Sequence, residues 1–158
     1  MPLQTDDLDD PLQTDRPVTL VLAASFDLVS QSLATLMRNL QASGVPQEAG
    51  QTATLVLAEI LNNVVEHAYR DHADGRIRLE LCLRSDSLQV EVTDTGHPIL
   101  GDLPRGRAAI ETDLPIEDLP EGGFGWGLIH LLTRDLSYER SGDTNCLRCQ
   151  IPLTEEAG

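Results

Sequence analysis

Two neighbouring segments of the chain alternate between apolar and polar residues, and this alternation constrains the fold more than any other feature of the sequence. The first runs from Arg76 to Arg84 and the second from Leu88 to Thr93, each with Leu, Ile or Val at every second position. Successive side chains of a β-strand point to opposite faces, so each segment has one apolar and one polar face. A sheet covered by helices on both faces would show continuous apolar runs instead. We therefore expect a β-hairpin, closed by residues 85–87, in a sheet that carries its helices on one face.

The order of the other predicted elements indicates a two-layer sandwich. In chain order these elements are a strand at Pro17–Leu22, a helix at Phe26–Ala42, a helix from Pro46 to about Tyr69, the hairpin just described, a helix at Phe124–Asp135 and a closing hairpin of Leu136–Arg140 and Cys146–Ile151. Helices and strands in this order pack as one layer on another. We expect an α/β fold of the α+β type, with a mixed sheet and about three helices on one face.

Three segments lie outside this regular pattern. Residues 1–16 are rich in Asp, Gln, Thr and Pro, a composition that does not bury enough apolar surface to order itself, so we expect a flexible acidic leader. Residues 17–153 would form the domain, followed by a short tail at 154–158. Within the domain, residues 99–121 are rich in Pro, Gly and Asp. A segment of this length without regular structure is usually a lid or a binding loop, so we expect a lid there.

The charged residues exclude several classes of protein. The net charge of -15 and the aromatic content of 3% argue against nucleic-acid binding, because phosphates repel an acidic surface and few rings are available to stack on bases. All eleven basic residues are arginine, and the sequence contains no lysine. A Walker-type phosphate loop, an ordinary protein kinase and a pyridoxal phosphate enzyme each need a lysine, so all three are excluded.

The sequence predicts neither a membrane span nor a structural metal site. The longest apolar run near the start, Val18–Ala24, is far shorter than the roughly 20 residues that a span requires. The three cysteines and the missing signal peptide indicate a reducing, cytoplasmic setting. Cys146 and Cys149 would face opposite sides of a strand, so we interpret both as structural. The four histidines show no metal-ligand spacing with a third partner.

The second predicted helix carries a polar stripe within its most apolar stretch, Leu55–Ala68. Glu59 and Asn63 stand one turn apart and project from the same side of the helix. Asn is unfavourable in mid-helix because its side chain competes for backbone hydrogen bonds, which indicates a role other than helix stability. A carboxylate can act as a general base and an amide oxygen can bind Mg²⁺, although a helical Glu more often lies at the solvent edge.

Two glycine-containing segments complete the set of candidate site residues. The first, Asp94-Thr95-Gly96-His97-Pro98, ends the second alternating strand. A carboxylate there can accept a hydrogen bond from an exocyclic amino group, and a glycine lets a planar base approach the backbone, but the same residues also suit an ordinary turn. The second, EGGFGWGL at residues 121–128, leads directly into a predicted helix. Free amides at a helix N-terminus attract phosphate, with a flexible loop as the alternative.

Taken together and in this order, the three segments resemble the Bergerat-type ATP-binding fold of the GHKL superfamily, and within it the anti-sigma-factor serine/threonine kinases. The matching sequences are AEILNNVVEHAY at 58–69, VTDTGHP at 92–98 and EGGFGWGLIHLL at 121–132. The resemblance covers roughly residues 17–152, and the joint order of the segments is more specific than any one of them. Pro98 stands where many members have a second glycine, and Trp126 is bulkier than the usual aliphatic residue.

The resemblance implies a role for each candidate residue. Glu59 would be the catalytic base, Asn63 the Mg²⁺ ligand and Asp94 the contact to adenine. Gly96 would flank the base. The phosphates of ATP would lie against a further set of residues, namely Gly123, Gly125, Gly127 and the lid arginines Arg105 and Arg107.

The resemblance also implies partners. Kinases of this family use MgATP to phosphorylate a serine on a STAS-type anti-sigma-factor antagonist, and they hold a sigma factor inactive, commonly as homodimers. Phosphorylation releases the antagonist, so such a protein is a partner switch. Two alternatives stay open. One is an ATP-binding regulatory module that sequesters a partner without kinase activity, and the other is a stand-alone histidine-kinase-like ATPase.

Overall fold

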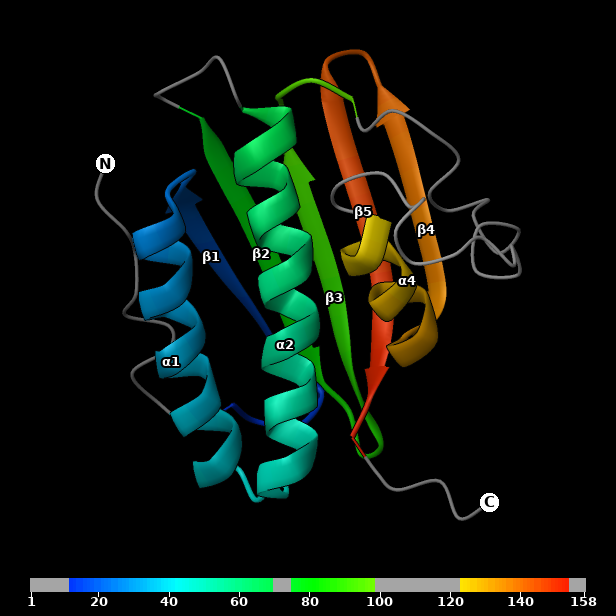
Figure 1. The fold of residues 1–158 in the computed structure, drawn as a ribbon. Coiled ribbons are helices and arrows are strands. Elements are labelled where there is room, and N and C mark those ends of the chain that lie inside the picture. The colour runs from blue at the N-terminus through cyan, green and yellow to red at the C-terminus, as the bar shows by residue number, and fades with distance from the viewer. Residues whose placement is uncertain (1–11, 70–74, 99–122, 154–158) are drawn as a thin grey trace.

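The structure is a computed structural model that describes residues 12–69, 75–98 and 123–153 (Figure 1). Its elements, in chain order, are β1 Pro17–Ala23, α1 Phe26–Ala42, α2 Gln47–Asn63, the π-helical turn η2 Val64–Ala68, β2 Arg76–Leu83, β3 Ser87–Asp94, α4 Gly123–Leu132, β4 Arg134–Ser141 and β5 Thr144–Pro152. The predicted residues of α1 are confirmed at both ends. This helix starts after Ser25, whose hydroxyl accepts a hydrogen bond from the Leu28 amide, and it stops before Gly44, which has a positive φ.

The five strands form one sheet in the order β1-β2-β3-β5-β4, with α1, α2 and α4 on one face (Figure 1). The predicted two-layer α+β sandwich is therefore confirmed. The prediction of a mixed sheet is wrong, because all four strand pairings are antiparallel. Two features of the topology account for this. The pair α1 and α2 connects β1 to β2, which makes these two strands antiparallel, whereas a single helix would have made them parallel. Among the described elements, the single helix α4 does connect two strands of the same direction, β3 and β4, but β5 lies between them in the sheet.

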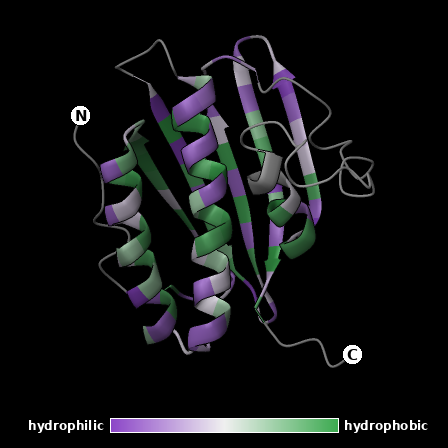
Figure 2. Ribbon diagram, in the orientation of Figure 1, coloured by the Kyte–Doolittle hydropathy of each residue, from purple (hydrophilic) through white to green (hydrophobic). Residues whose placement is uncertain are grey.

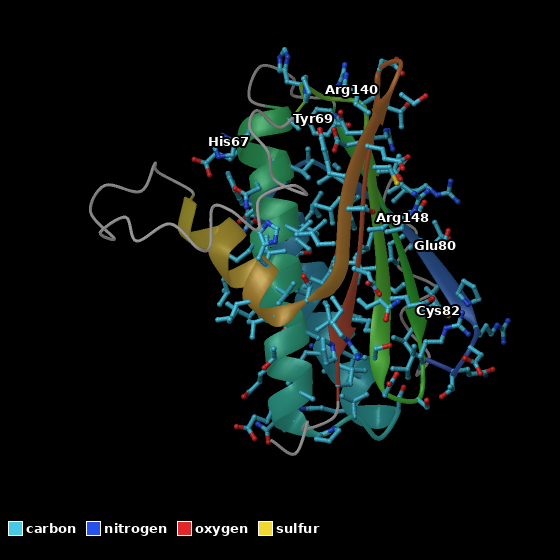
Figure 3. All side chains as sticks on the ribbon, turned by 90° about the vertical axis from the view of Figure 1, so that its right-hand side faces the viewer. His67, Tyr69, Glu80, Cys82, Arg140 and Arg148 are labelled. Carbon is cyan, nitrogen blue, oxygen red and sulfur yellow. The ribbon has the colours of Figure 1, made fainter. Side chains whose placement is uncertain are left out.

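The core lies between the helices and the inner face of the sheet. The apolar positions of β2 and β3 that alternation assigned to one face are all buried, and Figure 2 shows the same alternation of hydrophobic and hydrophilic residues along the strands. Figure 3 shows the opposite face of the sheet, where Glu80, Cys82 and Arg148 lie away from the helices. On that outer face Glu80 and Glu91 stand directly opposite each other across β2 and β3. Arg148 Nε lies 3.0 Å from a Glu91 carboxylate oxygen, which offsets the repulsion between the two carboxylates.

Residues 12–16, which the sequence assigned to the leader, contact the folded domain. Leu12 is only 5% exposed and belongs to the hydrophobic core, and its carbonyl accepts a hydrogen bond of 2.8 Å from the Ser43 hydroxyl. The Asp15 amide donates to the Leu83 carbonyl at 2.7 Å, and the Asp15 carboxylate pairs with Arg84 at 2.8 Å. One buried leucine and an ion pair therefore hold residues 12–16 against the sheet and α1. The rest of the predicted leader, the lid at 99–121 and the tail lie outside the described residues.

Cys146 and Cys149 lie on opposite faces of β5. Cys149 lies in the hydrophobic core, whereas Cys146 is only partly buried and stands beside Thr93 in the sheet, so the prediction that they face opposite sides is confirmed. Among the described residues, none of the helices has the length and apolar character needed to cross a membrane.

Candidate functional site

The helix that carries Glu59 and Asn63 changes character directly after Asn63. The sequence predicted a continuous helix to about Tyr69, but α2 ends at Asn63 and the next five residues form the wider π-turn η2. The Tyr69 amide closes this turn by donating to the Val64 carbonyl, five residues back, at 3.1 Å. Short π-helical insertions occur frequently at functional sites, where they change the direction of the side chains that follow.

Asn63 is buried, with 6% of its surface exposed, and its side-chain nitrogen donates to the backbone carbonyl of Glu59 at 2.6 Å. This bond fixes the amide group on its own helix, so that the side-chain oxygen, Oδ1, points away from the Glu59 carbonyl. The Glu59 side chain is partly exposed. The stripe therefore presents one fixed amide oxygen and, one turn earlier, one carboxylate within reach of solvent. Oxygen donors in such small numbers suit Mg²⁺, which keeps several of its waters when a protein binds it.

Asp94 ends β3 as a buried carboxylate, 5% exposed. Its oxygen Oδ1 accepts two hydrogen bonds, from the Gly96 amide at 2.9 Å and from the side-chain nitrogen of Asn145 at 2.8 Å. Burial raises the pKa of Asp94 above that of an ordinary aspartate, while these two bonds and the charge of Arg140 act in the opposite direction. Both of these hydrogen bonds use the same carboxylate oxygen, Oδ1.

Gly96 brings the Asp94 turn into direct contact with the end of the Asn63 helix. A Cβ atom on Gly96 would overlap the backbone carbonyl of Ala68, the last residue of η2. The same carbonyl accepts a hydrogen bond of 2.7 Å from the His97 amide. Only glycine permits this approach. The structure thus brings two sequence-predicted site segments, 31 residues apart at Asn63 and Asp94, into direct contact at Ala68.

Asn145 and Arg140 hold this turn from the other side, and the sequence did not single them out. Asn145 is 1% exposed and stands directly opposite Asp94 in the pairing of β3 with β5. Its side-chain nitrogen also lies 3.1 Å from the Gly96 carbonyl, and its side-chain oxygen accepts a bond of 2.8 Å from Arg140. Arg140 additionally donates to the Gly96 carbonyl at 3.1 Å. Asn145 falls between the two predicted strands of the closing hairpin, and only the register of β5 against β3 could have revealed its position opposite Asp94.

Helix α4 lies beside α2 on the same face of the sheet, and it is mostly hydrophobic (Figures 1 and 2). It begins at Gly123, and Ile129 anchors it in the core. Gly123 and Gly125 occupy the first turn, where backbone amides have no partner within the helix. Gly127 lies just beyond that turn, and a Cβ atom there would meet nothing within 4 Å. The predicted glycines therefore belong to the helix itself, with open space beside Gly127.

The histidine of η2 and the two lid arginines are not among the residues that the structure brings together at this site. His67 lies on the side of η2 that faces away from the sheet (Figure 3), with its ring 3.8 Å from the Glu66 carboxylate. The described part of the chain contains no group of three His, Cys, Asp or Glu residues that could hold a metal. Arg105 and Arg107 fall in 99–122 and lie outside the described residues.

Known proteins place the chain in a family. Residues 22–151 match the histidine kinase-like ATPase domain, and this range contains every residue of the site described above. The chain belongs to this family. Its relatives include serine-protein kinase RsbW of Oceanobacillus iheyensis, 26% identical over 75% of this chain and 76% of the relative. Serine-protein kinase RsbW of Listeria monocytogenes serotype 4a is 30% identical over the same shares, and that of Bacillus cereus is 32% identical over 52% of this chain and 51% of the relative.

The family and its relatives confirm the resemblance that the three sequence segments indicated. An ATPase domain of the histidine-kinase-like type uses ATP, and the similar proteins are named as serine-protein kinases. The roles of single residues, the use of Mg²⁺ and the identity of any partner remain predictions.

Proposed function

We propose that the protein is a serine/threonine protein kinase that binds MgATP and phosphorylates a serine on a STAS-type anti-sigma-factor antagonist, while it sequesters a sigma factor. One observation carries the nucleotide part of this proposal. The turn that holds Asp94 packs, through Gly96, on Ala68 at the end of η2, which directly continues the helix that carries Glu59 and Asn63. The proposed adenine contact, metal ligand and general base therefore lie on two segments that are in direct contact.

The adenine base would bind at the Asp94 turn. Oδ1 of Asp94 is already occupied by the Gly96 amide and Asn145, so Oδ2 would accept a hydrogen bond from the exocyclic amino group. In a buried site an ionised acceptor makes a strong hydrogen bond to such a donor. Guanine carries an oxygen where adenine carries this amino group, so the same carboxylate would disfavour GTP.

Asn63 would hold Mg²⁺ through Oδ1, because its nitrogen is engaged by the Glu59 carbonyl. When bound, Mg²⁺ offsets part of the negative charge of the phosphates, which matters in a chain with a net charge of -15. The free amides at the start of α4, including those of Gly123 and Gly125, would hold phosphate oxygens. We place Arg105 or Arg107 of the proposed lid over the same phosphates.

Glu59 would act on the acceptor serine. The serine oxygen forms a bond to the γ-phosphorus, the bond from that phosphorus to the bridging oxygen breaks, and ADP leaves. The carboxylate of Glu59 takes the proton of the serine hydroxyl. Its partly exposed position allows a protein substrate to approach it, in contrast to the buried Asn63 and Asp94.

The partners follow from the family resemblance. Serine as the acceptor is supported by the relatives, which are named serine-protein kinases. The other partners are proposed from the resemblance to the anti-sigma-factor kinases, which act in this way. These partners are a STAS-type antagonist, a sigma factor and a second copy of the chain, and the proposed location is the cytoplasm. Neither a nucleic acid nor a membrane is among the proposed partners.

A phosphotransfer assay with γ-labelled ATP tests this function. Mg²⁺, wild-type protein and the antagonist that co-purifies with it should yield phosphoserine on the antagonist, mapped by mass spectrometry. Glu59→Gln should bind ATP but lose transfer, since it lacks the proton acceptor. Glu66→Gln is the matched control, because Glu66 is exposed on η2 and pairs only loosely with His67, and it should transfer phosphate normally.

The same assay separates the alternatives. Phosphate release without a partner would identify a stand-alone ATPase, and an acid-labile phosphohistidine would identify a histidine-kinase-like activity. ATP binding with neither release nor transfer would contradict the kinase and favour a module that sequesters its partner.

A further inference from the structure

Tyr69 occupies a position that none of the proposed roles uses. It directly follows the π-turn η2, and it is buried, with 6% of its surface exposed. Figure 3 places it between the end of the helix and the sheet, at the same end of the molecule as Arg140. Its hydroxyl donates to the Arg76 carbonyl at 2.6 Å and accepts a hydrogen bond from the Thr95 amide at 2.8 Å. One hydroxyl thus bonds to the start of β2 and to the residue that follows β3.

The ring of Tyr69 is held as firmly as its hydroxyl. Gly75 lies flat against it, and a Cβ atom on Gly75 would overlap three atoms of the ring. The carbonyl of the preceding residue, Ala68, accepts the hydrogen bond from His97. Backbone therefore packs directly on the ring at Gly75, and the residue before Tyr69 is bonded to the turn that follows β3.

Thr95 stands between the two residues that would contact the nucleotide base, Asp94 and Gly96. The bond from its amide to Tyr69 is therefore a constraint on the path of the chain between them. Together with the bond from His97 to Ala68, it ties the turn to the helix that carries Asn63. Residues 68 and 69 therefore connect the turn of Asp94, the proposed adenine contact, to the helix of Asn63, the proposed Mg²⁺ ligand.

We propose that Tyr69 is a positioning residue for nucleotide recognition, which fixes the Asp94–Gly96 turn through the Thr95 amide so that Oδ2 of Asp94 meets the adenine amino group. This inference rests on the proposed nucleotide site. Tyr69 itself does not touch the base. Its hydroxyl fixes the path of the backbone between Asp94 and Gly96. If this turn moved, the hydrogen bond from the adenine amino group to Asp94 would weaken more than the contacts to the phosphates, because hydrogen bonds depend strongly on geometry.

Tyr69→Phe tests the proposal because it removes only the hydroxyl. The affinities of the full chain for MgATP and MgGTP are measured by displacement of a fluorescent ATP analogue. ATP affinity should fall about tenfold, the size expected for one lost hydrogen bond at a buried site, while GTP affinity changes little. The preference for ATP over GTP should therefore fall by the same factor. Amide hydrogen exchange at Thr95, measured without nucleotide, should be faster in the variant.

Tyr138→Phe is the matched control, since it removes the same group from the only other tyrosine, which pairs with Leu147 in β4 and β5. It should keep the ATP preference of the wild type. Gly75→Ala is a second variant that displaces the ring while the hydroxyl remains, and it should lower the ATP preference in the same direction as Tyr69→Phe.

The outcomes separate this inference from the proposed function. A purely structural role would lower ATP and GTP affinity equally, and an unchanged ATP preference in Tyr69→Phe would overturn the inference while the nucleotide site stands. A wild-type protein that binds neither nucleotide would instead overturn the proposed function, and the inference with it.

Discussion

Asp94 is a carboxylate that the fold makes costly to ionise and that the proposed function needs in its ionised form. Burial raises its pKa, whereas the hydrogen bonds from Asn145 and Gly96 and the charge of Arg140 lower it. A carboxyl whose pKa is higher in the folded than in the unfolded chain adds stability at low pH, and this contribution is lost as the pH rises through the folded pKa. At neutral pH the ionised Asp94 therefore lowers the stability of the fold, and we attribute its presence to the proposed binding of adenine.

This balance predicts the titration of Asp94. A carbon-detected NMR titration of the free protein should give a midpoint above the ordinary aspartate value of about 3.8. Asn145→Ala should raise the midpoint further, because a hydrogen bond that favours the ionised form is lost. ATP affinity should decrease as the pH falls through this midpoint. A wild-type midpoint at or below 3.8, or a decrease in Asn145→Ala, would contradict this description of the site.

The residues that frame Asp94 show how far the sequence can predict such a site. Glu59, Asn63, Asp94 and Gly96 could be selected because their types and spacing suit a chemistry. Asn145 could not, since its importance depends on the register of β5 against β3, two strands separated by about 50 residues of chain. The local sequence does not distinguish an asparagine in an ordinary turn from one, such as Asn145, whose side chain bonds to two other segments.

Helix α4 illustrates the same point at the scale of an element. Its existence follows from an apolar run that contains several glycines. The sequence predicted a helix at Phe124–Asp135, whereas the helix spans Gly123–Leu132. The length of α2 was predicted with a similar error, because periodicity does not distinguish an α-helical from a π-helical last turn. The difference in α2 lies beside the proposed site, because η2 directly follows Asn63.

Gly127→Ala distinguishes the effect of this glycine on helix stability from its proposed role in ATP binding. Replacing a helical glycine by alanine should raise the free energy of unfolding by up to about 1 kcal/mol, since open space surrounds this position. If the phosphates lie against α4, the added methyl group should weaken ATP binding by roughly tenfold or more. Thermal unfolding and calorimetry measure the two effects. Gly50→Ala, in the first turns of α2, should leave ATP affinity unchanged, and a Gly127→Ala protein that binds ATP normally would remove α4 from the phosphate site.

At the scale of the whole molecule, the single-sided sheet was predictable and its strand directions were not. Alternation in β2 and β3 requires one solvent-facing side of the sheet, and the described helices all lie on the other side. Strand direction depends on how many helices connect two strands, and here the pair α1 and α2 makes β1 and β2 antiparallel. The net charge of -15 also bears on the proposed site, because the proposed Mg²⁺ and the amides of α4 would have to offset the negative charge of ATP locally.

The measurement that tests this account most directly is the calorimetric titration of ATP, with and without Mg²⁺, into the wild type, Asn63→Ala and Asn62→Ala. Asn62 is the matched control, because it is the neighbouring asparagine but lies off the stripe that Glu59 and Asn63 share. The account predicts Mg²⁺-dependent binding by the wild type and by Asn62→Ala, and the loss of that binding in a folded Asn63→Ala protein. Equal affinity of Asn63→Ala and the wild type for MgATP would contradict it.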